Sequence, residues 1–315
     1  FHLPLQLSLM EESVQMIERT ERTVEINEKI FTVRIPDLSQ KPAFASLNRG
    51  YSFYGSFSHE GVQDEELRLQ AKHDTDTFNR VEAMRSLTDK QRISILENPE
   101  HVVDPAWLDL YGELLADDSV NPSLKAFLIK IEEQPLNRNY VTWYPELVFA
   151  RDRLVRAINA RHRQRLMTIF DDLDTYGRRS DPKDGIEDRI LKNTLLDLIA
   201  TVDCPESHDI ILRHWDRATT ATDKVSALNA LNRSSSPMRK QLIEETYTKW
   251  HDHLSAYANY LRIISSGSCD DVFEMIELER RRSSFDVTNP TWSRALFIPM
   301  AMNNRKVWTD EGIEW

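Results

Sequence analysis

Cysteine and glycine are both scarce in this sequence of 315 residues. The two cysteines, Cys204 and Cys269, lie far apart and form no CxxC pair, which argues against a disulfide framework, a redox site or a thiolate metal site. The same pattern is typical of a reducing compartment, so we expect the protein to be cytoplasmic. Only 8 glycines occur, which suits long helices better than a turn-rich β protein.

Long apolar runs and an excess of positive charge are also missing. No apolar stretch approaches the length of a membrane span and no secretory signal pattern occurs in these residues, so no membrane partner is expected. The net charge is −11, whereas proteins that grip phosphate backbones are usually basic. The one strong basic run, residues 151–165, could form a nucleic-acid patch, but a solvated helix face paired with carboxylates is the favoured interpretation. We therefore expect no nucleic-acid partner.

The sequence also lacks the motifs that carry a catalytic metal or nucleophile, including GxSxG and the P-loop. Two histidines four positions apart on a helix, with a glutamate between them, would hold zinc on one helix face. Residues 59–63 (HEGVQ) begin in this way but place Gln63 where the second histidine is needed, and His251 and His253 are only two positions apart. We therefore predict no catalytic residues, no metal site and no cofactor in this chain.

The first part of the chain has the alternating apolar pattern of β-strands. The alternation covers four ranges: residues 1–9, 23–26, 30–35 and 51–57. Four strands with one apolar face are not stable alone in water. They must therefore pack on a second sheet, on the helical part of the chain, or on a segment that precedes residue 1.

From about residue 59 to residue 315, apolar residues recur every three or four positions, which predicts helices. Residues 72–87 (KHDTDTFNRVEAMRSL) mark the transition. Four apolar residues of this stretch are spaced by three positions, and Asp74 and Asp76 lie where negative charge suits the start of a helix. We expect one of the first helices of a large helical domain here.

Several expected helix starts combine a capping residue with a following proline. These pairs are Asp104-Pro105, Asn121-Pro122, Ser236-Pro237 and Asn289-Pro290. Residues 88–91 (TDKQ) fit the capping-box pattern, residues 147–158 and 166–173 predict two consecutive helices, and residues 177–185 predict a loop. About ten to twelve helices without a fixed repeat period predict a mainly α protein, built as an irregular α-solenoid or superhelical bowl.

Four segments in the same order resemble bacterial aminopeptidase N, the alanyl aminopeptidase type of zinc peptidase. They are FHLPL at residues 1–5, HDTDTFNRVEA at residues 73–83, YTKWH at residues 247–251 and SFDVTNPTWSR at residues 284–294. The third segment is one residue shorter than the spacing usual in the family. The fourth matches the family's Ser-Phe…Asn-Pro…Arg segment at the expected spacing.

The resemblance implies the C-terminal portion of a longer enzyme. It divides the chain into a small β-sandwich module, residues 1–58, and a helical C-terminal cap domain, residues 59–315, truncated at its C-terminal end. In the family the catalytic zinc lies in a preceding domain. The implied function is therefore non-catalytic: the chain encloses the active-site cleft and controls access of short peptides whose N-terminal residues the parent enzyme removes. Its partners would be its own catalytic domain and those peptides, and it would be inactive alone.

The resemblance also implies one substrate-binding residue, Arg294. In the family, an arginine after the Asn-Pro helix start faces the cleft and can meet the C-terminal carboxylate of a peptide, a role that suits a planar guanidinium. The sequence departs from the family pattern at Trp292, where a basic residue is common. In the alternative interpretation, Arg294 only pairs with a nearby carboxylate such as Asp286 or Glu279.

A different class of function also fits the helical pattern. An α-helical scaffold can bind a partner protein on its concave face without any enzymatic role. The seven tryptophans could form a ligand-stacking surface, but aromatic residues at helical spacing usually belong to the core. Trp292 and Trp308 are left open, because both lie in the part that resembles the wall of the cap.

Overall fold

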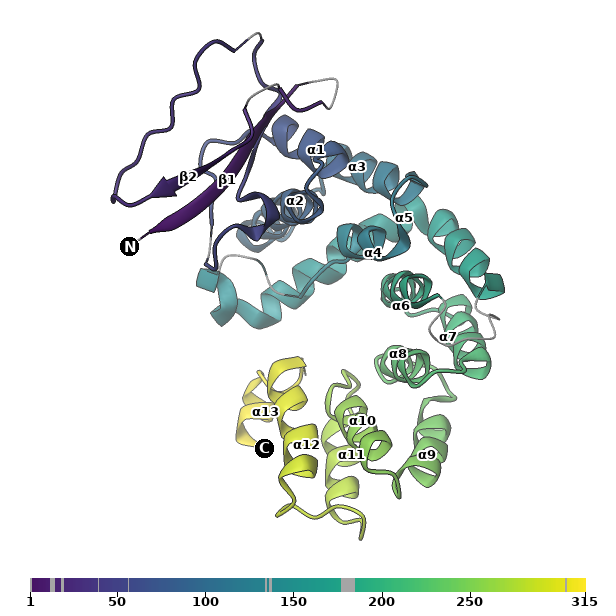
Figure 1. The fold of residues 1–315 in the computed structure, drawn as a ribbon. Coiled ribbons are helices and arrows are strands. Elements are labelled where there is room, and N and C mark those ends of the chain that lie inside the picture. The colour runs from purple at the N-terminus through teal and green to yellow at the C-terminus, as the bar shows by residue number, and fades with distance from the viewer. Residues whose placement is uncertain are drawn as a thin grey trace. The chain divides into compact units, whose positions relative to one another are not determined.

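In the computed structural model the chain is mainly helical, as predicted (Figure 1). The structure describes residues 2–11, 15–17, 20–38, 40–55, 57–133, 135, 138–176, 185–303 and 305–315. Within these residues, three strands are followed by thirteen α-helices. None of the helices in this part of the chain is long and apolar enough to cross a membrane.

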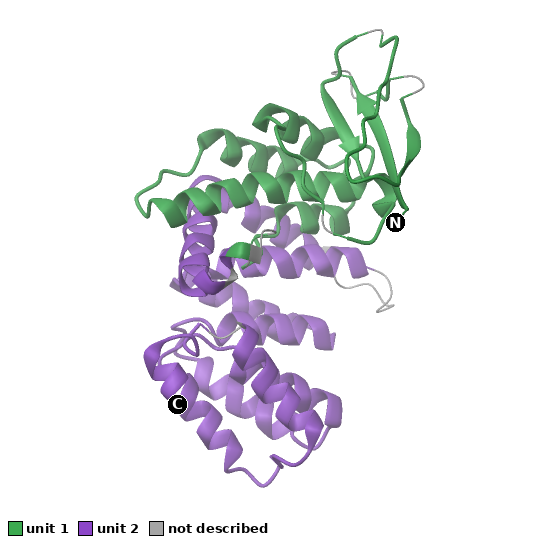
Figure 2. Cartoon of the chain, turned by 90° about the vertical axis from the view of Figure 1, so that its left-hand side faces the viewer, with its two compact units in different colours: residues 1–139 green, residues 140–315 purple. Residues whose placement is uncertain are grey.

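The chain forms two compact units, residues 1–139 and residues 140–315, which are coloured separately in Figure 2. The first unit contains the three described strands and the first four α-helices, and the second contains the nine that follow. The sheet and the first helices therefore belong to one compact body. The division into a β module of residues 1–58 and a helical domain of residues 59–315 stays a prediction.

The described strands form one antiparallel sheet in the order β2-β1-β3. The strands are β1 (Leu3–Met10), β2 (Arg22–Ile26) and β3 (Phe44–Leu47). Leu5 lies opposite Val24 across one ladder, and Leu9 lies opposite Ala45 across the other. The predicted strands at residues 1–9 and 23–26 are thus confirmed over their described parts. The second sheet of the expected sandwich is not seen in the described residues, and the sandwich stays a prediction.

Two of the predicted strands are wrong. Residues 30–35 form no strand, and no residue of this stretch is fully buried: Ile30 is 82% exposed, and Val33 and Ile35 are only half-buried. The described part of residues 51–57 forms a turn and bends, because Asn48, Gly50 and Tyr51 all have positive φ. The central strand instead pairs with β3, a segment too short to show clear alternation.

The first unit contains four helices: α1 (Asp64–His73), α2 (Thr77–Glu97), α3 (Pro105–Ala116) and α4 (Pro122–Ile129). The predicted helix at residues 72–87 is thus the end of one helix and the start of the next. Asp76 caps α2, since its carboxylate accepts from the backbone N–H of Asn79 at 3.0 Å. The capping box at residues 88–91 is wrong. Thr88 is buried within α2, and its hydroxyl donates to the carbonyl of Met84.

The second unit contains nine described helices. They are α5 (Tyr144–Tyr176), α6 (Ile186–Ala200), α7 (Pro205–Arg217), α8 (Ala221–Leu231), α9 (Arg239–Trp250), α10 (Leu254–Ser265), α11 (Val272–Arg280), α12 (Pro290–Asn303) and α13 (Asp310–Glu314). The two helices predicted at residues 147–158 and 166–173 are one, α5, because neither proline nor glycine interrupts the sequence between them. Of the loop predicted at residues 177–185, only Gly185 lies within the described residues; its φ of 79° precedes α6.

Three of the four predicted proline starts are confirmed, since Pro105, Pro122 and Pro290 each begin a helix. The fourth is displaced: α9 begins at Arg239, two residues after Pro237. The carbonyl of Ser236 accepts from the backbone N–H of Arg239, so a turn precedes the helix. Proline at the first helical position is favoured because its missing N–H would have no helical partner there.

The basic run of α5 contains ion pairs that support a charge-paired helix face. Arg151 is buried and its Nη2 lies 2.5 Å from Oδ2 of Asp197 on α6. Arg163 pairs with Glu206 on α7 at 2.9 Å. These contacts stabilise the packing of α5 on its neighbours. The absence of a nucleic-acid partner stays a prediction.

His214 of α7 is only 1% exposed. Its Nε2 lies 3.1 Å from Oδ1 of Asn193, and its ring packs edge-on to Phe170 at 5.7 Å between centroids. Burial, and then the positive charge of Lys192, lower the pKa of His214 to about 4. The imidazole is therefore neutral in the folded protein at neutral pH.

This pKa makes folding stability depend on pH. An unfolded histidine titrates near pH 6.5, so the unfolded chain binds more protons than the folded chain between about pH 6.5 and pH 4. The contribution of His214 is complete above that window and is lost as the pH falls through it, by on the order of 3 kcal/mol. We expect the free energy of unfolding, measured by urea titration, to fall more steeply on acidification in the native chain than in His214→Gln. The exposed His59→Gln variant is the control, and equal slopes for His214→Gln and the native chain would contradict the prediction.

Candidate functional site

Residues 73–80, the second of the family-like segments, make contacts that hold the first unit together. Asp74 is 3% exposed, and its carboxylate accepts from Nη1 of Arg49 and Nε2 of Gln70, both at 3.1 Å. The backbone N–H of Asp76 donates to the same carboxylate at 2.8 Å. Asp74 therefore joins the loop after β3 to the junction between α1 and α2.

Two further side chains of this segment reach the same loop and strand. The carboxylate of Asp76 accepts from the backbone N–H of Gly50 at 2.7 Å. The amide of Asn79 donates to the hydroxyl of Ser46 and to the carbonyl of Leu47, each at 2.9 Å. These contacts give the segment a structural role: it fixes the sheet on α2.

The third and fourth family-like segments meet inside the second unit. The hydroxyl of Ser284 lies 3.0 Å from that of Tyr247 and 3.2 Å from that of Tyr257. Phe285 is buried in the apolar core formed around α10 and α12. The amide oxygen of Asn289 accepts from the backbone N–H of Thr291 at 2.9 Å and caps α12. These residues, too, have local structural roles.

A buried carboxylate, Glu279, lies beside this contact. It is 1% exposed and accepts from the hydroxyls of Tyr257 at 2.5 Å and Tyr260 at 3.3 Å. Nε of Arg282 lies 3.3 Å away, and the Arg282 guanidinium stacks 3.5 Å from the centre of the Tyr247 ring. Burial raises the pKa of Glu279, and the donated hydrogen bonds oppose that rise.

Arg294, like Lys249 of the third segment, has a different environment from the carboxylates of these segments. It is exposed in the second turn of α12 and makes no hydrogen bond or ion pair with any other described residue. Asp286 accepts from the backbone and hydroxyl of Thr288 instead, and Glu279 has the partners given above. The structure thus contradicts the alternative in which either carboxylate pairs with Arg294. The substrate-binding role of Arg294 stays a prediction.

The two tryptophans left open by the sequence differ in exposure. Trp292 is half-buried, with its ring edge-on to Tyr257 at 4.9 Å, and packs against the core of the second unit. Trp308 is exposed, and its indole N–H donates to the carbonyl of Ala301 at 2.9 Å. Trp107, in contrast, is a core residue of the first unit.

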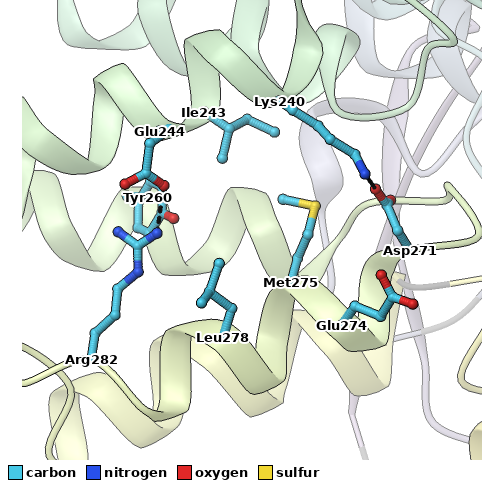
Figure 3. Close-up of a pocket in the computed structure, with 9 residues that line it drawn as sticks. All are labelled: Lys240, Ile243, Glu244, Tyr260, Asp271, Glu274, Met275, Leu278 and Arg282. Atoms are coloured by element: carbon cyan, nitrogen blue, oxygen red, sulfur yellow. Dashed lines mark hydrogen bonds and ion pairs between the residues drawn. The ribbon is translucent and has the colours of Figure 1, made fainter.

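A small cavity of about 220 Å³ lies between α9, α10 and α11 (Figure 3). The ion pair between Glu244 and Arg282 lies at one end, and the pair between Lys240 and Asp271 lies at the other. Apolar side chains, with Tyr260, line the space between them. This site was not predicted from the sequence. The signal in the sequence is Glu279, a charged residue within the buried stripe of α11, whose partners Tyr260 and Arg282 line the cavity.

No group of three or more histidine, cysteine, aspartate or glutamate side chains in the described residues could hold a metal ion. Cys204 and Cys269 are free thiols. The second histidine of a zinc motif is missing from residues 59–63 in the sequence itself, where Gln63 stands.

Comparison with known proteins shows which family these segments belong to. The family model described as a domain of unknown function (DUF3458_C) with ARM repeats matches residues 64–314. The chain belongs to this family. The match covers nearly all of the predicted helical domain, and the description agrees with a stack of helices.

Curated relatives with this similarity are aminopeptidases. Aminopeptidase N of Escherichia coli (strain K12) is 22% identical over 252 residues, which is 76% of this chain and 28% of that protein. Aminopeptidase N of Haemophilus influenzae (strain ATCC 51907 / DSM 11121 / KW20 / Rd) is 26% identical over 119 residues, which is 38% of this chain and 13% of that protein. The resemblance to the C-terminal portion of aminopeptidase N is thus confirmed.

A solved structure supports the same fold. The crystal structure of Legionella pneumophila aminopeptidase A in complex with aspartic acid matches 96% of this chain with a TM-score of 0.83 and 20% sequence identity. The matched region is 36% of that chain. This DUF3458_C chain therefore spans under a third of the curated relatives it matches and little more than a third of the solved structure.

Proposed function

We propose that this chain is the non-catalytic C-terminal region of a zinc-dependent aminopeptidase. The observation that carries the proposal is the alignment of 76% of the chain with E. coli aminopeptidase N. The chain would enclose the active-site cleft of the parent enzyme and control which peptides enter it. Closure of this kind excludes water and positions a substrate without performing the chemistry.

The finer features of the proposal follow from the same similarity. The β-sheet of the first unit would be part of a sandwich module, and the helices would form a bowl that faces the enzyme's own catalytic domain. Short peptides would be the ligands of that face. Two free thiols support a cytoplasmic location, since disulfides are rare there.

Arg294 gives the proposal a chemical basis. It is exposed and without an ionic partner among the described residues, whereas Asp74, Asn79 and Ser284 make internal hydrogen bonds. A guanidinium that keeps its charge and both of its donor edges can bind a carboxylate in a bidentate manner. We propose that it binds the C-terminal carboxylate of short peptide substrates.

The catalytic zinc would not be held by this chain. A zinc peptidase site needs two imidazoles on one face of a helix and a glutamate between them, and residues 59–63 supply only the first imidazole and the glutamate. The residues present thus do not fit the metal. The metal would instead lie in the part of the parent enzyme outside this chain.

The isolated chain tests this proposal. We expect residues 1–315 to bind no stoichiometric zinc and to release no product from alanyl p-nitroanilide, because the metal ligands are missing. Zinc content by mass spectrometry and the release of p-nitroaniline are the measurements, with a complete aminopeptidase N as the positive control. Hydrolysis by the chain alone, with one zinc per molecule, would show that a site exists here. A full reading frame without an upstream HExxH would instead favour the scaffold function.

A further inference from the structure

At one end of the cavity between α9, α10 and α11, two cationic side chains contact a single carboxylate. Asp271 is contacted by Nη2 of Arg239, 2.5 Å from each carboxylate oxygen, and by Nζ of Lys240 at 2.9 Å. The Arg239 side chain is 8% exposed and that of Lys240 is 74% exposed. Arg239 already contacts both oxygens of Asp271, so the exposed Lys240 ammonium at the rim can take a second partner.

Glu274 supplies the opposite charge at the same end. It lines the same cavity from α11, is exposed, and has no hydrogen bond or ion pair with another described residue. Figure 3 shows Lys240, Asp271 and Glu274 gathered at one end of the cavity. This end thus offers one ammonium and one carboxylate. A ligand that carries an ammonium and a carboxylate close together matches it, whereas a singly charged ligand leaves one of the two groups unused.

The rest of the cavity is suited to an apolar group. Ile243, Met275 and Leu278 lie between the two ion pairs (Figure 3). At the far end, Arg282 is already paired with Glu244 and Glu279, so that end needs no further charge. The volume of about 220 Å³ is below the roughly 300–1,000 Å³ of pockets for drug-sized ligands, which points to a small metabolite.

We infer that this cavity binds a free α-amino acid with an aliphatic side chain, such as leucine. The ligand carboxylate pairs with Lys240, its ammonium pairs with Glu274, and its side chain covers Met275 and Leu278. An α-amino acid has its ammonium and its carboxylate bonded to the same carbon atom, so the two groups can reach Glu274 and Lys240 together. A role in sensing released product rests on the proposed aminopeptidase function, but the binding itself does not.

The inference is tested by titrating L-leucine into the chain of residues 1–315 and measuring binding by isothermal calorimetry or ligand-observed NMR. We expect saturable binding with a Kd on the order of 1 mM, because the charged groups are at an exposed rim. L-leucinamide lacks the carboxylate and N-acetyl-L-leucine lacks the ammonium. The Kd of each should therefore be at least about tenfold higher than that of L-leucine. Absence of saturation up to about 50 mM L-leucine would overturn the inference.

Variants on one helix make the test specific. Glu274→Gln removes the carboxylate that faces the cavity and should weaken L-leucine binding by about fivefold or more. Glu277→Gln is the matched control, since Glu277 is on the same helix, pairs with Arg280 and does not line the cavity. Equal affinity of the Glu274→Gln variant and the native chain would reject the site. A negative peptidase result for the parent enzyme would overturn the proposed function and leave this binding result unchanged.

Discussion

In the complete enzyme, Arg294→Ala should raise KM for dipeptides and tripeptides by about 10- to 100-fold, the effect of losing a charge-assisted pair with a carboxylate. Aminoacyl arylamides carry no C-terminal carboxylate, so their KM should change little. Arg294 has no partner among the described residues, so its removal breaks no internal ion pair. Steady-state kinetics with alanyl-alanine and alanyl p-nitroanilide, measured side by side, give the comparison.

Two further variants separate substrate binding from folding. Arg294→Lys keeps the charge but loses the planar pair of donors, so its KM for dipeptides should lie between those of the native enzyme and the alanine variant. Arg281→Ala removes another exposed arginine of the second unit and should leave both substrates unaffected. An equal loss on peptides and arylamides in Arg294→Ala would assign the residue a folding role.

The second large effect concerns stability. Asp74→Ala should lower the free energy of unfolding of the first unit by about 3–5 kcal/mol, because it removes the buried carboxylate partner of Arg49 and leaves only the half-exposed Glu21, 3.7 Å from Nε of Arg49. It also removes the acceptor for Gln70 and for the backbone N–H of Asp76. Chemical denaturation of the chain, followed by circular dichroism, measures the loss.

A surface ion pair of the same unit is the control. Glu113 pairs with Lys72, and both side chains are partly exposed, so Glu113→Ala should cost no more than about 1 kcal/mol. In a double-mutant cycle, Arg49→Ala combined with Asp74→Ala should cost less than the sum of the two single variants, because the two residues share one buried contact. Additive losses would show that Asp74 stabilises the unit independently of Arg49.

Local sequence signals predicted the helix starts well where residues adjacent in the sequence determine them. The proline starts at Pro105, Pro122 and Pro290 depend on residues within one turn, and all three were predicted. The predicted strand at residues 30–35 failed for the opposite reason. Alternating apolar residues form a strand only if another strand and a core accept them, and the central strand pairs with β3 instead.

The candidate site was predicted only in part for a related reason. Arg294 was identified through a spaced motif, whereas the internal hydrogen bonds of Asp74, Asn79 and Ser284 were seen only in the structure. The cavity between α9 and α11 has no such motif. Lys240 and Glu274 are more than thirty positions apart, and each alone reads as an ordinary surface charge of a helix.

The sequence by itself determined that this chain is mainly helical and which family it resembles, because apolar periodicity, caps and short motifs are local properties. Tertiary structure decided which charged side chains are paired inside the protein and which remain available for a ligand. Asp74 and Glu279 look like surface carboxylates in the sequence, yet burial gives both of them obligatory partners. Arg294 and Glu274 stay exposed without such partners in the part of the chain that the structure describes. The reason is physical: the cost of an unpaired charge depends on its removal from water, and burial depends on residues distant in the chain.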